Sequence, residues 1–232
     1  MSHESEVVYY HNDESSSAVL VRIFRPHIRG RVLEVGAGVG FVTRQLAECT
    51  DSIIACEPTS VLVNQLRTRV ASLPNVEVRQ ETTQRLIDGG YRESFDTIIY
   101  FSVLEHIKDD AEEVRRAWDL LADGGRLLVL VPAHQWLYAK IDELSGHFRR
   151  YSRRSIRALF GTEFNPVEVR NFDTVGLLPY FILFRLLRNT NMSGVTASVY
   201  SKIVIRVSYL LHVVTRGRLI GKNLLVVAHK SR

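Results

Sequence analysis

The residues with the clearest chemical meaning stand where two apolar runs end. The first run, residues 31–35, leads into glycines at alternate positions, Gly36, Gly38 and Gly40, and the second run, residues 52–56, is followed by Glu57. Glycine permits a tight turn and lets a ligand approach the backbone closely. A carboxylate at the end of the neighbouring strand can accept hydrogen bonds from ribose hydroxyls. The spacing therefore predicts a nucleoside-binding α/β site.

The glycine spacing also narrows the kind of nucleoside. A dinucleotide site of the G-x-G-x-x-G type that starts at Gly36 needs glycine at position 41, where this chain has Phe41. The E-x-G-x-G-x-G string of residues 34–40 instead resembles motif I of the class I S-adenosylmethionine (SAM) dependent methyltransferases. Further segments resemble the same family in its order: residues 75–82, residues 95–107 with an FD…LEH string, and residues 121–132 with a Gly-Gly turn. The resemblance covers residues 32–132.

This resemblance implies SAM as the cofactor and assigns a role to each matching residue. Glu34 would order the glycine loop or meet the ammonium group of SAM, and Glu57 would bind the ribose hydroxyls. Glu81 and its neighbour would lie near the adenine amine, and Ser102 near the methionine part. The expected cofactor-binding set is Glu34, Gly36, Gly38, Gly40, Glu57, Glu81, Thr82 and Ser102.

Histidines and a tyrosine on the loops after the fourth and fifth strands are candidates for proton transfer. His106, His147 and Tyr151 are the candidate catalytic residues, and His134 is placed with the substrate. A histidine with a pKa near neutrality can take a proton from an attacking hydroxyl or amine. His106 also belongs to the LEH string that is common in the family, so an architectural role is the alternative for it.

The segment of residues 146–152 resembles a "GH.RRYs" string found in one branch of the family. Arg149 and Arg150 are expected to bind a phosphate or carboxylate of the substrate. Five arginines fall within residues 149–157, and the formal net charge of the chain is +5. The alternatives are a solvated basic helix face and a Ser152 that only caps a helix.

Apolar periodicity predicts a strand and helix alternation, and hence a mostly parallel sheet with right-handed crossovers. Strands are expected at 32–35, 53–56, 76–80, 95–101 and 126–131, and helices at 41–48, 60–72 and 110–121. Ser60 and Asp109 or Asp110 are expected to begin two of these helices, and Gly124 to end the last. A leader helix within residues 16–28 would cover the cofactor, with Tyr9, Tyr10 and His11 near it.

In the last third of the chain, the sequence predicts a loop at 133–151, a helix at 152–160, a strand at 167–171, a helical insertion at 177–214 and a final strand at 224–229. The chain is expected to form one domain, a seven-stranded Rossmann-like class I methyltransferase sheet flanked by helices, with this insertion before the last strand. Residues 1–30 would form a cap, 31–175 and 220–232 the core, and 176–219 an insertion or lid. Val199, Ile203, Val207, Leu210 and Val214 form one apolar stripe, expected to pack on the body, to act as a lid, to dimerise, or to contact a membrane surface.

The composition narrows the class of protein further. No apolar run reaches the ~18 residues of a membrane span, and the polar start is unlike a secretory signal. Cys49 and Cys56 form no C-x-x-C pair, and no set of His, Asp or Glu is spaced like a metal site. A cytoplasmic protein without a metal is therefore expected, with peripheral membrane contact left open and no indication of the oligomeric state.

The function expected from the resemblance is methyl transfer from SAM to oxygen or nitrogen of a small molecule, with anionic and lipid-linked acceptors included. RNA methylation is one alternative because the chain is basic. The tip of the fourth strand has neither an N-P-P-Y string for base amines nor a Pro-Cys nucleophile, which argues against most nucleic-acid substrates. A second alternative is a regulatory protein that binds SAM without turnover.

Overall fold

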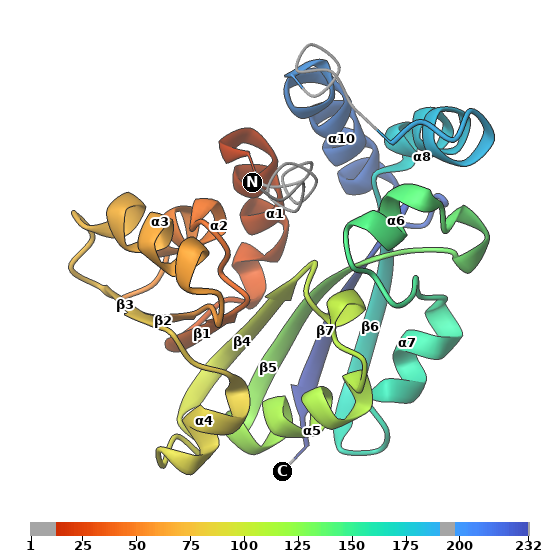
Figure 1. The fold of residues 1–232 in the computed structure, drawn as a ribbon. Helices are drawn as coiled ribbons and strands as arrows, with labels where there is room; N and C mark the ends of the chain where they lie inside the picture. The colour runs from red at the N-terminus through yellow and green to blue at the C-terminus, as the bar shows by residue number, and fades with distance from the viewer. Residues whose placement is uncertain (1–12, 191–197, 232) are drawn as a thin grey trace.

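A single seven-stranded sheet organises the chain (Figure 1). The computed structural model describes residues 13–190 and 198–231. The strand order is β3-β2-β1-β4-β5-β7-β6, and only β7 runs antiparallel to its neighbours. The strands are β1 Arg31–Val35, β2 Ser52–Cys56, β3 Val76–Arg79, β4 Phe95–Phe101, β5 Leu121–Pro132, β6 Phe164–Phe172 and β7 Asn223–Lys230. The expected seven-stranded class I methyltransferase sheet is confirmed.

Helices cover both faces of the sheet. The principal helices are α1 Glu14–Phe24, α2 Phe41–Ala47, α3 Ser60–Val70, α4 Thr83–Asp88, α5 Asp110–Leu120, α6 Lys140–Leu144, α7 Arg153–Leu159, α8 Thr174–Tyr180 and α10 Ile205–Thr215. Short 3-10 turns are η3 Arg25–His27, η4 Leu104–His106 and η5 Gln135–Leu137, and π-helical turns are η6 Phe181–Leu186 and η7 Tyr200–Val204. Tyr9, Tyr10 and His11 lie outside the described residues.

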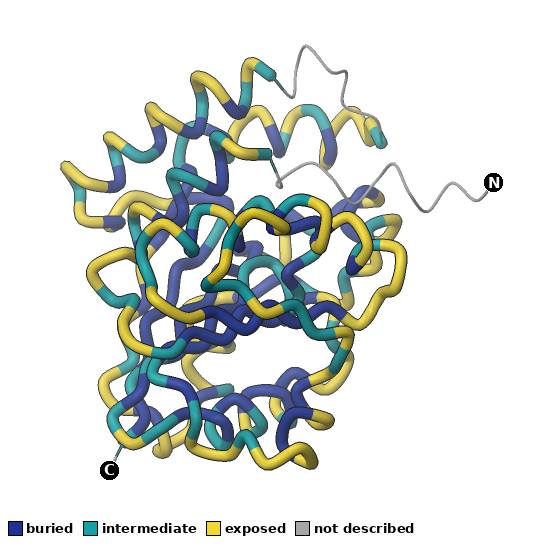
Figure 2. The backbone as a smooth tube through the Cα atoms, turned by 90° about the vertical axis from the view of Figure 1, so that its left-hand side faces the viewer, coloured by how far each residue is buried: buried dark blue, intermediate teal, exposed yellow. Residues whose placement is uncertain are grey.

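Alternating side chains of the strands fill two cores. On β5, Leu127 and Val129 pack toward the face covered by α4, α5 and α7, while Leu128 and Leu130 pack toward α1, α2 and α3. This period of two is what a strand buried on both faces requires. Figure 2 shows the buried backbone running through the middle of the molecule between more exposed outer segments.

Helix starts were predicted better than helix ends. Asp109 caps α5, because its side chain accepts a hydrogen bond from the Glu112 N–H at 3.0 Å, as expected. Helix α3 begins at Ser60 as predicted, but its N-cap residue is Thr59. No side chain caps the start of α3 by a hydrogen bond. Gly124 does not end α5, which stops at Leu120; it lies within β5 with φ +68° near a register shift in the pairing with β4.

Two regions of the last third differ from the sequence prediction. The expected loop at 133–151 contains η5 and α6. The apolar stripe of the insertion, from Val199 to Val214, does not pack on the body, because all five of its side chains are exposed, by 44% to 72%. That interpretation of the stripe was wrong, and its outward orientation needs another explanation.

Topology places the insertion at the same edge as the glycine loop. The strands β1, β2, β4, β5 and β6 are parallel, so their carboxyl ends share one edge, and β7 begins there because it runs the other way. The segment between β6 and β7 must therefore leave and re-enter the sheet at that edge. Figure 1 shows α1, α6, α8 and α10 gathered at this end. Ligands of open α/β sheets bind at the carboxyl ends of the strands.

Candidate active site

The glycine loop and Glu57 meet directly at the carboxyl ends of β1 and β2. The Glu57 side chain is buried, and its Oε2 accepts a hydrogen bond from Gly38 N at 3.0 Å. Its other oxygen, Oε1, accepts from Thr59 N at 2.9 Å. A carboxylate can accept about four hydrogen bonds. The backbone therefore fixes Glu57 in place and leaves acceptor capacity for a ligand.

The loop conformation itself requires glycine. Gly36 has φ +68° and Gly40 has φ +88°. A Cβ atom at Gly36 would lie 2.6 Å from the Val103 side chain, and one at Gly40 would lie 2.5 Å from Leu66. Any larger residue would therefore be strained in φ and would also push against the element behind it.

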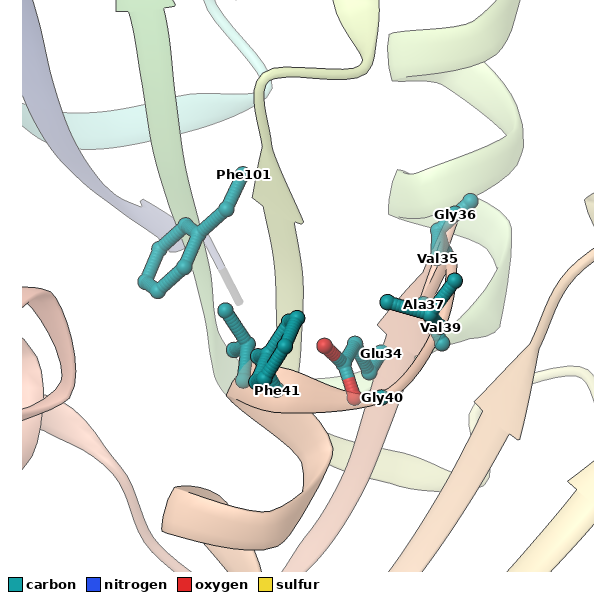
Figure 3. Close-up of a pocket in the computed structure, with 9 residues that line it drawn as sticks. Glu34, Val35, Gly36, Ala37, Val39, Gly40, Phe41 and Phe101 are labelled. Atoms are coloured by element: carbon teal, nitrogen blue, oxygen red, sulfur yellow. The ribbon is translucent and has the colours of Figure 1, made fainter. Parts of the chain in front are cut away.

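Glu34 is a buried acid beneath this loop. It is 4% exposed, and its Oε2 has no hydrogen-bond partner within the described part of the chain. Figure 3 shows its carboxylate beside Phe41, with Phe101 across from it. Together with the loop residues these side chains line a small hollow. Burial raises the pKa of Glu34 to about 8. An unpartnered buried acid next to a nucleoside-type loop fits the ammonium group of SAM.

Replacement of Glu34 by Gln is expected to stabilise the protein increasingly as pH rises. Between pH 4.5, the ordinary pKa, and about 8, the folded protein holds a proton that the unfolded chain has lost, so wild-type stability falls with rising pH in this window. The melting temperature of the variant relative to wild type should rise by several degrees, at ~2 to 4 °C per kcal/mol. Thermal unfolding from pH 5 to 9 checks this, with the exposed Glu48→Gln as control. Parallel curves for Glu34→Gln and wild type would contradict it.

The other predicted cofactor residues lie at the same edge. Glu81 follows β3 and is half-buried, with its Oε2 3.8 Å from Arg79 Nη1. The Thr82 hydroxyl caps α4 by accepting from Arg85 N at 3.4 Å. Ser102 follows β4 in the left-handed region, with φ +56°. The carboxyl ends of β1, β2, β3 and β4 thus lie next to one another, and a polar residue lies at each of these ends.

The predicted catalytic histidines are adjacent. His106 ends η4 after β4, and its ring lies edge-on to His147, with ring centroids 4.6 Å apart. One side of the His106 ring is exposed and the other is buried. This burial, together with the nearby His147, lowers the pKa of His106, so His106 is neutral at pH 7. The two loops are joined because Phe148 N donates to the Glu105 carbonyl at 2.8 Å.

Asp142 on α6 orients His147. Its Oδ1 lies 3.0 Å from His147 Nδ1. Burial opposes ionisation of Asp142, but hydrogen bonds from His147 and Arg150 outweigh it and lower its pKa. Because an ionised carboxylate only accepts, His147 Nδ1 carries the proton, and neutral His147 presents an Nε2 lone pair. An acid that holds a histidine in this tautomer is the arrangement used for general bases.

Asp142 is also the acceptor for three further groups. Its Oδ1 accepts a hydrogen bond from Arg150 Nε at 2.9 Å and lies 2.7 Å from Arg150 Nη2. Its Oδ2 accepts hydrogen bonds from Tyr180 Oη and Ala139 N, both at 2.8 Å. Arg150 is 7% exposed and lies over the Tyr180 ring. These contacts, the Asp142 network, connect α6, the GH.RRYs segment and the insertion. They argue against direct contact of Arg150 with a substrate.

Arg149 and Tyr151 also have internal partners. Arg149 Nη1 lies 2.7 Å from Asp110 Oδ2, and its Nη2 donates to the Lys108 carbonyl at 2.7 Å. Tyr151 Oη donates to the same Asp110 oxygen at 2.7 Å. Burial, with Asp110 adding to it, raises the pKa of Tyr151, so its hydroxyl holds its proton. At 2% exposure Tyr151 is poorly placed for catalysis, in contrast to its prediction.

His134 takes an unusual backbone conformation after β5. Its φ is +64°, and its Nε2 lies 3.1 Å from the Gly221 carbonyl at the end of the insertion. The ring is half-buried beside Trp136, with centroids 5.6 Å apart. His134 therefore links the end of β5 to the insertion at the site edge.

Glu105, His106 and His147 bring ligand-type atoms within 4.8 Å of one another. Two histidines and a carboxylate are a composition that binds divalent transition metals. The sequence prediction contained no metal, since neither the spacing nor the LEH string indicated one. Burial raises the pKa of Glu105 to about 7, and its Oε2 has no partner in the described residues. The cluster can serve proton transfer or hold a cation, and the assay below separates the two.

Sequence reasoning missed the acids that position these side chains. The carboxylates of Asp142 and Asp110 contact His147, Arg149, Arg150 and Tyr151, whereas Glu105 accepts from Phe148 N through its backbone carbonyl. The only signal in the sequence was that Asp142 precedes His147 by five residues, which a predicted loop could not convert into a contact.

Comparisons with known proteins agree with this geometry. Residues 33–127 match the model of a family described as a methyltransferase domain. A ubiquinone biosynthesis O-methyltransferase of Azorhizobium caulinodans is 30% identical over 110 residues, which are 47% of this chain and 42% of the relative. The chain thus matches less than half the length of that relative.

Solved structures share the fold across the whole chain. A SAM-dependent methyltransferase from Archaeoglobus fulgidus has a TM-score of 0.65 at 15% identity, over 95% of this chain and 96% of that one. A phosphoethanolamine N-methyltransferase of Haemonchus contortus, solved with S-adenosylhomocysteine, has a TM-score of 0.62 at 15% identity, over 100% of this chain and 61% of that one. Residues 33–127 therefore resemble a methyltransferase domain, and the seven-stranded sheet is the fold that these solved methyltransferases share.

Proposed function

We propose that this protein transfers a methyl group from SAM to an oxygen or nitrogen atom of a small molecule. The observation that carries the proposal is the pairing of the glycine loop with Glu57, held by Gly38 N and Thr59 N above the buried acid Glu34. The relative named as an O-methyltransferase supports oxygen as the accepting atom. The neighbour solved with phosphomonomethylethanolamine supports anionic acceptors, and the ubiquinone-related name supports lipid-linked ones.

The residues have complementary roles in this proposal. SAM supplies an electrophilic methyl group on a cationic sulfur. Glu57 binds the ribose, Glu34 meets the ammonium group, and Glu81, Thr82 and Ser102 border the adenine and methionine parts. Orientation of the two reactants can contribute about 7 to 11 kcal/mol to the barrier reduction. His147 accepts the acceptor's proton at Nε2, and His106 and His134 border the acceptor.

Arg149, Arg150 and Tyr151 act as positioning residues in this proposal. Their contacts with Asp110 and Asp142 fix the loop that carries His147. The same contacts weaken the RNA alternative, because two of the five clustered arginines face inward and not toward a partner. Arg153, Arg154 and Arg157 remain exposed on α7.

Glu57→Gln is expected to weaken SAM binding about 10- to 100-fold, since hydrogen bonds to a charged acceptor contribute about 1.5 to 3 kcal/mol. Calorimetric titration of SAM measures this, and the exposed Glu48→Gln should bind like wild type. Equal affinity of Glu57→Gln and wild type would remove Glu57 from the site.

Transfer of labelled methyl from SAM tests the reaction itself. The panel contains hydroxylated aromatics, phosphorylated amines and an RNA transcript, and label is expected in a small molecule. Binding of SAM without transfer to any of them would favour the regulatory alternative. A base at His147 predicts activity that survives EDTA, whereas loss with EDTA and recovery with Zn²⁺ would assign the histidine cluster to a metal.

A further inference from the structure

The solvent-facing side of the insertion carries apolar side chains. On η7 and α10 the inward-facing stripe is Ser201, Ile205, Ser208 and His212, all buried. The opposite stripe, Val199, Ile203, Val207, Leu210 and Val214, is exposed. A helix on a water-soluble surface normally shows the reverse arrangement.

Specific hydrogen bonds hold the helix in this orientation. Ser208 Oγ donates to Asp173 Oδ1 at 2.7 Å, and Tyr200 Oη donates to Asp173 Oδ2. His212 Nδ1 lies 3.0 Å from the Asn171 carbonyl. Asp173 is fully buried, and its Oδ1 also accepts from Gly176 N at the start of α8. Rotation of the helix to bury its apolar stripe would break these bonds, so the exposure is built into the fold.

The neighbouring segment also exposes apolar side chains. Leu178 of α8, Ile182 and Leu186 of η6, and Leu187 directly after η6 are exposed. Trp136 packs beside η6, with its ring 5.9 Å from the ring of Phe181. Figure 1 shows α8 and α10 next to each other at one end of the molecule. We call the exposed apolar residues of α8, η6, η7 and α10 the insertion face. Exposed apolar side chains gathered on neighbouring helices indicate an interaction site.

The charged residues of the insertion itself have one sign. Residues 174–232 contain no Asp or Glu, and the insertion contains six basic residues: Arg185, Arg188, Lys202, Arg206, Arg216 and Arg218. All six are exposed. An amphipathic helix with an apolar stripe and Lys or Arg at its flanks is typical of helices that lie in the interface of anionic membranes.

We propose that the insertion face docks onto the surface of an anionic lipid bilayer, with its apolar stripe in the headgroup region and its basic residues on the lipid phosphates. A second copy of this chain is a poorer occupant, because a symmetric pairing would bring two sets of six exposed basic residues together. No helix in residues 13–190 or 198–231 is long and apolar enough to cross a membrane. The docking rests on the exposure and charge of the insertion and does not depend on the proposed reaction.

If the proposed methyl transfer also holds, docking brings the site edge close to the lipid surface. The insertion and the glycine loop leave the same edge of the sheet. An acceptor dissolved in the bilayer would then reach the site without crossing water, which extends the lipid-linked part of the proposal.

Vesicle sedimentation of the full chain tests the docking without use of activity. The probes are vesicles of phosphatidylcholine alone and of an equal mixture of phosphatidylcholine and phosphatidylglycerol. Binding is expected with the anionic vesicles and should weaken with salt. Lys202→Glu with Arg206→Glu should lower the partition coefficient by about tenfold or more, because each basic residue near an anionic surface adds to binding. Arg67→Glu with Arg115→Glu, the same charge change on α3 and α5, should leave it near wild type.

A second pair of variants tests the apolar stripe. Leu210→Gln should reduce vesicle binding several-fold, whereas Val61→Gln, at a side chain with nearly equal exposure on α3 (65% against 61%), should not. Unfolding curves confirm that each variant is folded. Absence of wild-type binding to anionic vesicles, or equal effects of the test and control variants, would overturn the proposal. Light scattering that shows a dimer dissociated by Leu210→Gln would assign the face to a second copy.

Discussion

Asp142→Asn is expected to lower the free energy of unfolding by about 3 to 5 kcal/mol, because it leaves the buried Arg150 guanidinium without its counter-charge. The Asp142 side chain is 1% exposed and accepts hydrogen bonds from His147, Arg150, Tyr180 and Ala139 N. The expected fall in melting temperature is roughly 6 to 20 °C for a chain of this size. Denaturant or thermal unfolding measures the effect.

A control variant and the pH dependence of stability separate the effect of the Asp142 network from a general effect of charge. Asp123→Asn changes an exposed acid and should alter stability by less than about 0.5 kcal/mol. The pKa of Asp142 is lowered in the fold, so its contribution is present above the ordinary pKa of 3.8 and is lost as pH falls below it. The stability difference between wild type and Asp142→Asn should therefore be constant above about pH 5 and shrink toward acid. A difference that grows toward acid would contradict the network.

His147→Gln is expected to lower kcat about 10²- to 10⁴-fold, which is the usual contribution of general base catalysis. SAM affinity should not change, because His147 lies with the loops after β4 and β5 and not with the glycine loop. Steady-state assays with the acceptor found in the transfer panel measure both quantities.

His229→Gln is the matched control, since His229 lies in β7 opposite Arg126, toward the amino end of β5. It should retain wild-type kcat. A wild-type rate in His147→Gln would exclude it as the base, and a large loss in His106→Gln instead would assign proton transfer to the neighbouring ring.

The strands and the cofactor edge were predictable because they depend on local pattern. Apolar runs of four to seven residues, each ending at a glycine or polar residue, gave β1, β2 and β4 to within a residue. The topology then placed Glu57 and the glycine loop at one edge without any knowledge of side-chain contacts. Gly124 was misjudged because a glycine after a helix also fits a bulge inside the next strand.

The network around His147 could not be predicted, because it depends on contacts between segments far apart in the sequence. Tyr180 in α8 reaches Asp142 in α6 across 38 positions, and Tyr151 reaches Asp110 across 41. The orientation of α10 could not be predicted for the same reason. The periodicity of Val199 to Val214 gave a stripe, but the partners of Ser208 and His212 decide which side faces outward.

A crystal structure of the protein soaked with S-adenosylhomocysteine tests the central claim most directly. The account predicts density along the glycine loop, with both ribose hydroxyls within hydrogen-bond distance of the Glu57 carboxylate and the amino group of the ligand facing Glu34. Ligand density bound elsewhere, or a ribose that does not contact Glu57, would contradict it.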